Sequence, residues 1–299
     1  MSQYDVMDST LSAAGKGRRA TIRRGVRLGK LFDIEIEIDS SWFFVFALVT
    51  WNLWTGFSQW HPDWSVALDA TTALAASLLF FASVLAHELA HSLVARRRGL
   101  PVHSITLFFF GGVSNLQREP ESPATEFVMA IVGPLTSLFL GFLFLALGST
   151  AAGGVQPALD DPVNALAHLS PLSTLLLWLG QVNILVGLFN MVPAFPLDGG
   201  RVFRSLVWGA TKDLPRATKW AAKLSHLIAW SFMIAGVAMM FGARVPFFGS
   251  GFIGGIWIAM IGWFLRGAAV SSSRQLVVSD PLDGVGISRV MPRRDSWPR

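Results

Sequence analysis

Six long apolar stretches constrain the fold of this chain more than any other feature. A helix needs about 20 apolar residues to cross a hydrocarbon layer of about 30 Å, and lipid cannot satisfy the backbone groups of an irregular chain. Hydrophobic residues make up 52% of the sequence and charged residues only 14%. We therefore predict an all-α polytopic membrane protein with about six transmembrane helices. The stretches cover residues 41–57, 71–95, 124–147, 172–192, 220–241 and 247–265.

The positions of the basic residues predict how the chain is oriented in the membrane. Residues 1–30 contain seven Lys and Arg and indicate a basic cytoplasmic tail without a cleavable signal peptide. The connections after the second and fourth stretches are also basic, as at 96–98 and 201–219, whereas the alternate connections carry mainly Asp. This distribution follows the positive-inside rule. We expect a multi-pass protein of the cytoplasmic membrane with both termini in the cytoplasm. Membrane orientation explains the net charge of +5, so no nucleic-acid partner is expected.

A small β element is expected between the second and third stretches. Residues 102–116 are rich in β-branched and aromatic side chains around Gly111 and Gly112, a pattern typical of two strands joined by a turn. The edge of a hairpin leaves backbone groups unpaired, so it must face water, a protein-lined cavity or an incoming strand. The sequence therefore predicts a membrane-associated β-hairpin or sheet around a Gly-Gly turn.

A His-Glu-Leu-Ala-His motif lies in the second stretch. His87 and His91 are four residues apart, so they share one helix face and can converge on one metal ion, with Glu88 beside the position of a metal-bound water. Such side chains are costly in a bilayer unless they are paired or metallated. A buried hydrogen-bonded cluster is the alternative, but packing alone does not require this spacing. His91 would lie only ~8 Å from Arg96, which places the site in the cytoplasmic half of the membrane.

Catalytic zinc usually has three protein ligands, so the motif needs a further carboxylate or His. Asp198 is the strongest candidate, because it follows the fourth stretch at the depth of the two His residues. Pro193 and Pro196 interrupt regular helix there, and the two glycines at 199–200 permit a tight turn, so an irregular backbone can present the carboxylate. The alternative is an Asp that caps a helix in an ordinary loop. The chain has no Cys, which excludes thiolate ligands, and His with carboxylate also suits other first-row ions.

Three motifs in this order resemble the site-2 protease family of intramembrane zinc metalloproteases. They are residues 87–91, the Gly-Pro-Leu of 133–135, and the Asn-x-x-Pro-x-x-Pro-Leu-Asp-Gly-Gly run of 190–200. The resemblance covers roughly residues 30 to 270. It implies one catalytic Zn²⁺ and a β element that aligns an extended substrate. The implied roles are metal ligands at His87, His91 and Asp198, a general base at Glu88, substrate or oxyanion binding at Asn190, and substrate alignment at Gly111 and Gly112.

The function implied by this resemblance is regulated intramembrane proteolysis by a zinc metalloendopeptidase. Zinc would polarise the scissile carbonyl and activate a water, and Glu88 would take the proton of that water. The expected partners are the lipid bilayer and single-span transmembrane substrates. The expected domains are a six-span domain at 31–270 and a cytoplasmic tail at 271–299. The tail resembles the start of a CBS region but is too short for a CBS pair. Regulation by nucleotides, which a CBS pair would imply, is therefore not expected from the resemblance. The substrate, any prior cleavage and the oligomeric state stay open.

Two other protein classes compete with this interpretation. A transporter or scaffold could use intramembrane His and carboxylate groups to relay protons or bind an ion, although it has no need of the Glu beside the first His. Another class of membrane metalloprotease takes a Glu as third ligand, but the last Glu of the sequence is Glu126. Among the remaining polar residues, we expect Gln181 and Asn183 to hydrogen-bond between helices, with a catalytic role as the alternative, and His103 to be structural.

Overall fold

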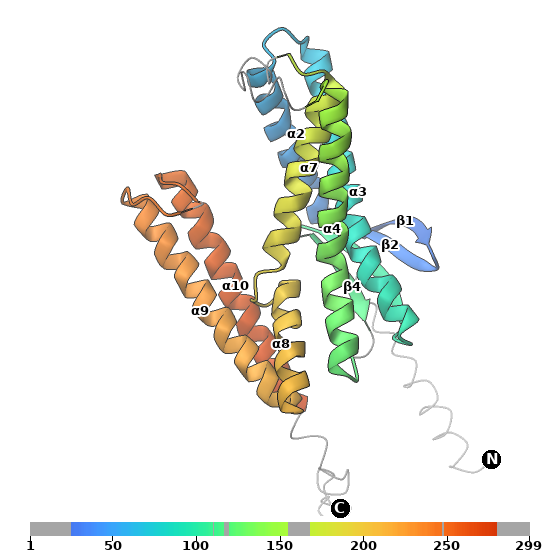
Figure 1. Cartoon of the computed structure of the whole chain (residues 1–299), viewed down its shortest axis with the longest axis vertical. Coiled ribbons are helices and arrows are strands. Elements are labelled where there is room, and N and C mark those ends of the chain that lie inside the picture. The colour runs from blue at the N-terminus through green and yellow to red at the C-terminus, as the bar shows by residue number, and fades with distance from the viewer. Residues whose placement is uncertain (1–24, 110, 117–119, 155–167, 247, 280–299) are drawn as a thin grey trace, which may run out of the picture.

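Helices dominate the computed structural model, which describes residues 25–109, 111–116, 120–154, 168–246 and 248–279. Figure 1 shows these helices with a small sheet beside one end of the bundle. The predicted fold class is confirmed. The helices are α2 (Ser40–Trp60), α3 (Val66–Arg97), α4 (Pro123–Ala151), α7 (Pro171–Asn190), α8 (Asp198–Thr211), α9 (Leu214–Met240) and α10 (Phe252–Ser279). The strands are β1 (Gly25–Leu31), β2 (Ile34–Asp39), β3 (Val102–Phe108) and β4 (Gly111–Leu116).

Each apolar stretch falls largely within one of these helices, but the helices differ in length and apolarity. Within the described residues, α3, α4, α7 and α9 are long and apolar enough to cross a membrane. The 21-residue α2 is not among them, and Phe252–Gly267 of α10 forms a shorter apolar helix. The multi-pass character is therefore supported by four helices, and the count of six spans stays a prediction.

The predicted hairpin exists as part of a larger sheet. The strand order is β1-β2-β3-β4, with antiparallel outer pairs and a parallel central pair. Gly111 and Gly112 pair with Phe108 and Leu107. The expectation of a Gly-Gly turn is therefore wrong, because both glycines belong to the ladder of β4 and the turn precedes them.

The strand pair β1 and β2 was not predicted. Ile34, Ile36 and Ile38 are buried and alternate with acidic residues, which is the period-2 pattern of a strand with one buried face. Residues 25–30 of the expected 1–30 tail lie in β1, and residues 271–279 of the expected C-terminal tail lie in α10. The rest of both tails, 1–24 and 280–299, lies outside the described residues.

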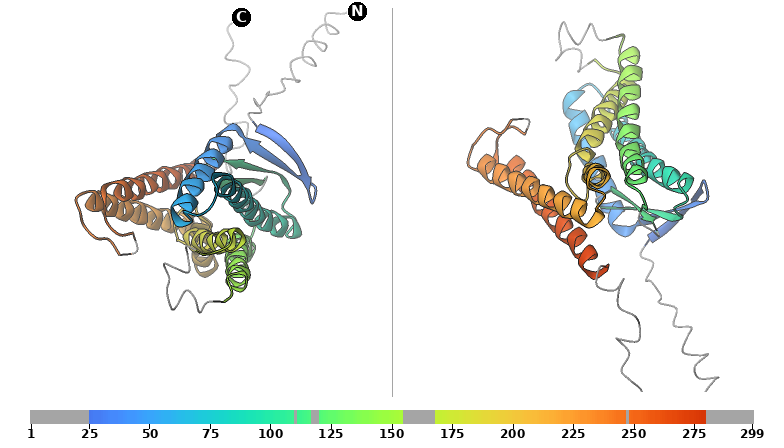
Figure 2. Two further views of the ribbon diagram at one scale, coloured as in Figure 1. Left: turned by 90° about the horizontal axis from the view of Figure 1, so that it is seen from above. Right: turned by 60° about the horizontal axis from the view of Figure 1, so that its bottom comes forward.

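The sheet is anchored on the end of α3 that follows the His motif. Ile34 and Ile36 pack in one buried cluster with Ile105 of β3, Ala95 of α3 and Met129 of α4. Figure 2 shows the sheet beside α3, while α9 and α10 form a pair that diverges from the other helices. The short α8 lies between α4 and α9, and it packs against both. The site is therefore built where α3, α4, β4 and α8 meet.

Candidate metal centre

Helix α3 presents its two His side chains on one face, as their spacing predicts. The helix starts at an N-cap Ser65, whose side chain accepts a hydrogen bond from the Leu68 N–H, and continues unbroken to Arg97. His87 and His91 are both buried, at 5% and 8% exposure. Their imidazole planes are tilted by 73°, so both ring edges are directed toward one point rather than stacked. The helix therefore presents two candidate ligands one turn apart.

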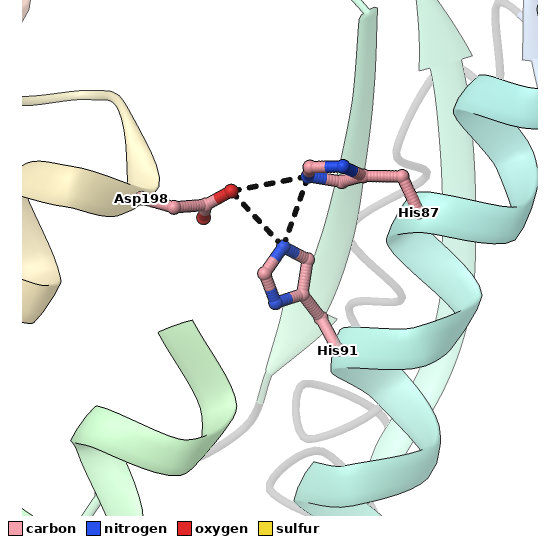
Figure 3. Close-up of side chains that lie close together, drawn as sticks. All are labelled: His87, His91 and Asp198. Carbon is pink, nitrogen blue, oxygen red and sulfur yellow. Dashed lines mark hydrogen bonds and ion pairs between the residues drawn. The ribbon is translucent and has the colours of Figure 1, made fainter. Parts of the chain in front are cut away.

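Asp198 completes a triangle of possible metal ligands. Its Oδ2 lies 3.0 Å from His87 Nε2 and 3.2 Å from His91 Nε2, and the two Nε2 atoms are 3.1 Å apart. Figure 3 shows the three side chains pointing toward one another from α3 and α8. In the described part of the chain, this is the one group of three His or carboxylate residues with spacing suited to an ion.

The backbone at Asp198 differs from the expected irregular loop. Residues 191–197 are irregular, but Asp198 itself is the first residue of α8, with Leu197 at the N-cap position. Asp198 therefore does not cap the helix. Burial raises the pKa of its carboxyl, but contacts with His87 and His91 lower that pKa by more, and it lies below its usual range. A lowered pKa suits a metal ligand, which must bind in its ionised form.

The hydrogen bonds of the imidazoles favour a metal over a metal-free cluster. His91 Nδ1 donates to the Met129 carbonyl at 2.6 Å, so in the neutral ring the Nε2 lone pair faces Asp198. His87 Nδ1 lies 2.9 Å from Ser137 Oγ, which can fix the same tautomer. Three electron-rich atoms this close repel one another unless a cation or an extra proton lies between them. Two ligands of a tetrahedral zinc, each about 2.1 Å from the ion, are roughly 3.4 Å apart, so the triangle fits one zinc ion.

Helix α4 makes room for the two imidazoles at Gly133. A Cβ atom at this position would overlap His91 Nε2 and lie 2.6 Å from His87 Nε2. Met129, Gly133 and Ser137 recur every four residues, so one face of α4 contacts both rings. In the sequence, Gly133 stands out only as part of the Gly-Pro-Leu motif, and no role was predicted for Met129 or Ser137. The available signal was a Gly and a Ser at helical spacing in a mostly apolar stretch.

Replacing Ser137 with Ala is expected to weaken zinc binding about 10-fold, because His87 loses the partner that orients its ring. The measurement is the zinc dissociation constant from competition with a chromophoric chelator. Thr136→Ala is the matched control, since the Thr136 hydroxyl bonds only to the Val132 carbonyl of its own helix among the described contacts. Equal affinities for the Ser137 and Thr136 variants would contradict a role of Ser137 in orienting the ligand.

Glu88 lies beside the triangle of ligand atoms and contacts strand β4. Its Oε2 accepts a hydrogen bond from Ser114 Oγ at 3.3 Å, and Ser114 Oγ lies 3.0 Å from Ser92 Oγ. A Cβ atom at Gly112 would overlap Glu88 Cγ. The glycine therefore allows β4 to approach α3 closely, and this close contact was not foreseen from the sequence. Gly111 has φ +127°, and a Cβ atom at this position would meet nothing within 4 Å. Its backbone conformation, rather than close packing, therefore favours glycine here.

The other singled-out polar residues do not join the triangle. Asn190, the last residue of α7, donates from its side chain to the Val186 carbonyl at 3.0 Å. Asn183 donates to Leu179 in the same helix, so the expected hydrogen bond between helices is not observed for it. His103 lies exposed on β3. The structure thus brings together three of the predicted site residues, with Glu88 and Gly112 adjacent.

Comparison with known proteins agrees with this geometry. The family model described as Peptidase family M50 matches residues 75–235, a range that contains the His motif, Gly133 and Asp198. The chain belongs to peptidase family M50. Two relatives of this M50 chain are each named "Putative zinc metalloprotease". Rip3 of Mycobacterium tuberculosis is 34% identical over 270 residues, and sll0528 of Synechocystis sp. is 36% identical over 262 residues.

These relatives are longer than the M50 chain described here. The alignments cover 90% and 88% of this chain but only 64% and 63% of the relatives. Among solved structures, the site-2 protease from Methanocaldococcus jannaschii is similar with a TM-score of 0.52 and 26% identity, covering 83% of this chain and 95% of that one. The resemblance to site-2 proteases noted from the sequence is confirmed.

Proposed function

We propose that this M50 chain is an intramembrane zinc metalloendopeptidase that cleaves transmembrane proteins. The observation that carries the proposal is the triangle of His87, His91 and Asp198, whose ligand atoms all lie within 3.2 Å of one another. The names of the relatives and the four helices of membrane-spanning length support it. A transporter or scaffold would need no carboxylate beside the first His, whereas hydrolysis requires a base at that position.

The residues around the triangle have separate tasks in hydrolysis. A zinc ion held by the three ligands would polarise the scissile carbonyl and lower the pKa of a water molecule toward about 7. Glu88 takes a proton from that water and passes it to the leaving amine. Ser114 holds the Glu88 carboxylate from the side of β4. Asn190 would bind the substrate or the oxyanion through the amide hydrogen that does not bond to the Val186 carbonyl.

Substrates are proposed to bind as extended segments along β4. Within the described strands, β4 forms one edge of the sheet, and Gly112 of this strand lies against Glu88. A substrate helix must unwind before its peptide bonds become accessible, and backbone pairing with a strand edge offsets the hydrogen bonds it loses. Single-span membrane proteins are the substrate class that fits this mode, because one helix can unwind without disrupting a packed bundle.

The proposed location of the site is the cytoplasmic half of the bilayer. His91 lies six residues before Arg97, where α3 ends in a cluster of three Arg residues at 96–98. The positive-inside rule places such a cluster in the cytoplasm. The same rule places both termini on that side when six helices span the membrane.

The test of this function is cleavage of a panel of single-span proteins by the purified full chain in detergent, with bound zinc measured in parallel. Wild-type protein is expected to contain one zinc ion and to cut at least one substrate, and chelation is expected to stop cleavage reversibly. His87→Ala is expected to lose both zinc and activity, because one of three ligands is gone. A wild-type protein that holds one zinc ion but cuts no substrate would instead support a binding or scaffold role.

A further inference from the structure

One face of α4 carries a buried carboxylate that the proposed mechanism does not use. Glu126 lies three residues before Met129 and seven before Gly133, so it continues the face that contacts the imidazoles. Its side chain is 0% exposed. Burying a carboxylate is costly unless it is paired and hydrogen-bonded. The partner of Glu126 therefore indicates what this residue does.

Glu126 is paired with α8, the helix that begins at Asp198. Arg204 Nε donates to Glu126 Oε1 at 2.7 Å, and an Nη group of Arg204 donates to the same oxygen. Arg201 Nε lies 3.8 Å from this oxygen. Arg204 has only 12% of its side chain exposed, so solvent screens the pair weakly. The ion pair thus connects α4 to α8 within two turns of the proposed ligand.

Arg204 also contacts the segment that leads into α8. Its guanidinium carbon lies 5.8 Å from the centroid of the Phe195 ring, and the Phe195 N–H donates to Ser225 Oγ of α9 at 2.8 Å. Arg204 therefore touches both α4 and the irregular residues before Asp198. Asp198 is 107 residues from His91 along the chain, so contacts between elements must set the position of the first turn of α8.

A purely stabilising role would not require this arrangement. An apolar pair of similar size often stabilises a contact between helices as well as a buried ion pair does. A hydrogen-bonded ion pair also fixes the orientation of one helix relative to the other. Both hydrogen bonds of Arg204 go to one oxygen of the carboxylate, Oε1. The same face of α4 orients His91 through the Met129 carbonyl and His87 through Ser137.

We propose that Glu126 is a positioning residue for the third metal ligand: through Arg204 it fixes α8 against α4, so that the carboxylate of Asp198 meets His87 and His91. Helix α4 then orients all three ligands from one face. The inference rests on the proposed metal site, and it concerns the affinity and geometry of that site rather than the cleavage step.

The experiment measures zinc affinity and the visible spectrum of bound Co²⁺ in the full chain. Glu126→Gln is expected to weaken zinc binding about 10- to 100-fold, as is typical when a residue that orients a ligand is lost. It is also expected to reduce the intense absorption bands of four-coordinate Co²⁺. Glu121→Gln removes an exposed acid five residues away and serves as the matched control with wild-type affinity. Wild-type affinity in the Glu126 variant would overturn the proposal.

A double-mutant cycle shows whether Glu126 acts through Asp198. In an Asp198→Asn background, Glu126→Gln is expected to cause no further loss of affinity, because the ligand that it positions is already impaired. The same fold-loss in both backgrounds would mean a general effect on folding and would overturn the inference. The proposed metal site is tested separately by comparing zinc binding of the wild type with that of His87→Ala. Failure of the metal site and failure of the positioning role therefore give different results.

A second pair of variants keeps the test valid if Glu126→Gln does not fold. Arg204→Lys retains a positive charge that can reach the carboxylate, and Arg204→Gln does not. Affinity is expected to be partly rescued in the Lys variant relative to the Gln variant, because Lys restores the charge but not both hydrogen bonds of Arg204. Equal affinities for these two variants, with both proteins folded, would contradict the role of the ion pair.

Discussion

Glu88→Gln is expected to lower the rate of peptide-bond cleavage by about 10²- to 10⁴-fold while one zinc ion stays bound. The amide keeps the shape of the side chain and still accepts the hydrogen bond from Ser114, but it cannot take a proton from water. The three ligand side chains are not altered, so metal content is expected to equal that of the wild type. Single-turnover cleavage of one single-span substrate, with zinc measured in the same samples, checks both expectations.

The control for this substitution is Glu121→Gln, which removes an exposed acid outside the site. It is expected to cut at the wild-type rate. Cleavage at the wild-type rate by the zinc-loaded Glu88 variant would exclude Glu88 as the base. Loss of zinc from that variant would show instead that Glu88 helps to hold the metal, and the proposed division of roles would then be wrong.

Gly133→Ala is expected to weaken zinc binding by about 100-fold or more and to abolish cleavage. The added methyl group would overlap His91 Nε2 and lie 2.6 Å from His87 Nε2, so both rings must leave the positions that converge on Asp198. Ala is otherwise the better helix residue by about 1 kcal/mol. Loss of metal in a protein that remains helical would therefore reflect the collision with the rings. Zinc stoichiometry and circular dichroism on one preparation provide the measurement.

Gly56→Ala provides the matched control for this effect. Gly56 lies in α2, and a Cβ there meets nothing within 4 Å. This variant is expected to bind zinc and to cut like the wild type. If Gly133→Ala also binds zinc as tightly as the wild type, the close packing of α4 against the imidazoles is not required for the metal site.

Much of the helical framework follows from local properties of the chain. The six apolar stretches lie largely within six helices, because runs of about 20 apolar residues have few other ways to satisfy their backbone in lipid. The 102–116 hairpin followed from its β-branched and aromatic content. Strand β1 was missed because its basic residues placed it in the expected 1–30 tail. Strand β2 was missed although Ile34, Ile36 and Ile38 alternate with acidic residues.

Local sequence patterns predicted only part of the proposed site. The convergence of His87 and His91 is a consequence of helix geometry at a spacing of four residues. A Cβ at Gly112 would overlap Glu88, and β4 approaches α3 so closely only because Gly112 has no side chain. The expected irregular backbone at Asp198 proved to be the start of α8, because the interruption by Pro193 and Pro196 ends before that residue.

The sequence by itself determined the polytopic helical class, the His-Glu-Leu-Ala-His face and the choice of Asp198 as candidate third ligand. Each depends on interactions within about one helical turn or on the simple length of an apolar run. Only the tertiary structure decided that Asp198 meets the two imidazoles, that Gly133 makes room for them, and that Glu126 connects α4 to α8. These contacts join residues that are far apart along the chain, and packing between helices, which no local pattern specifies, sets their geometry.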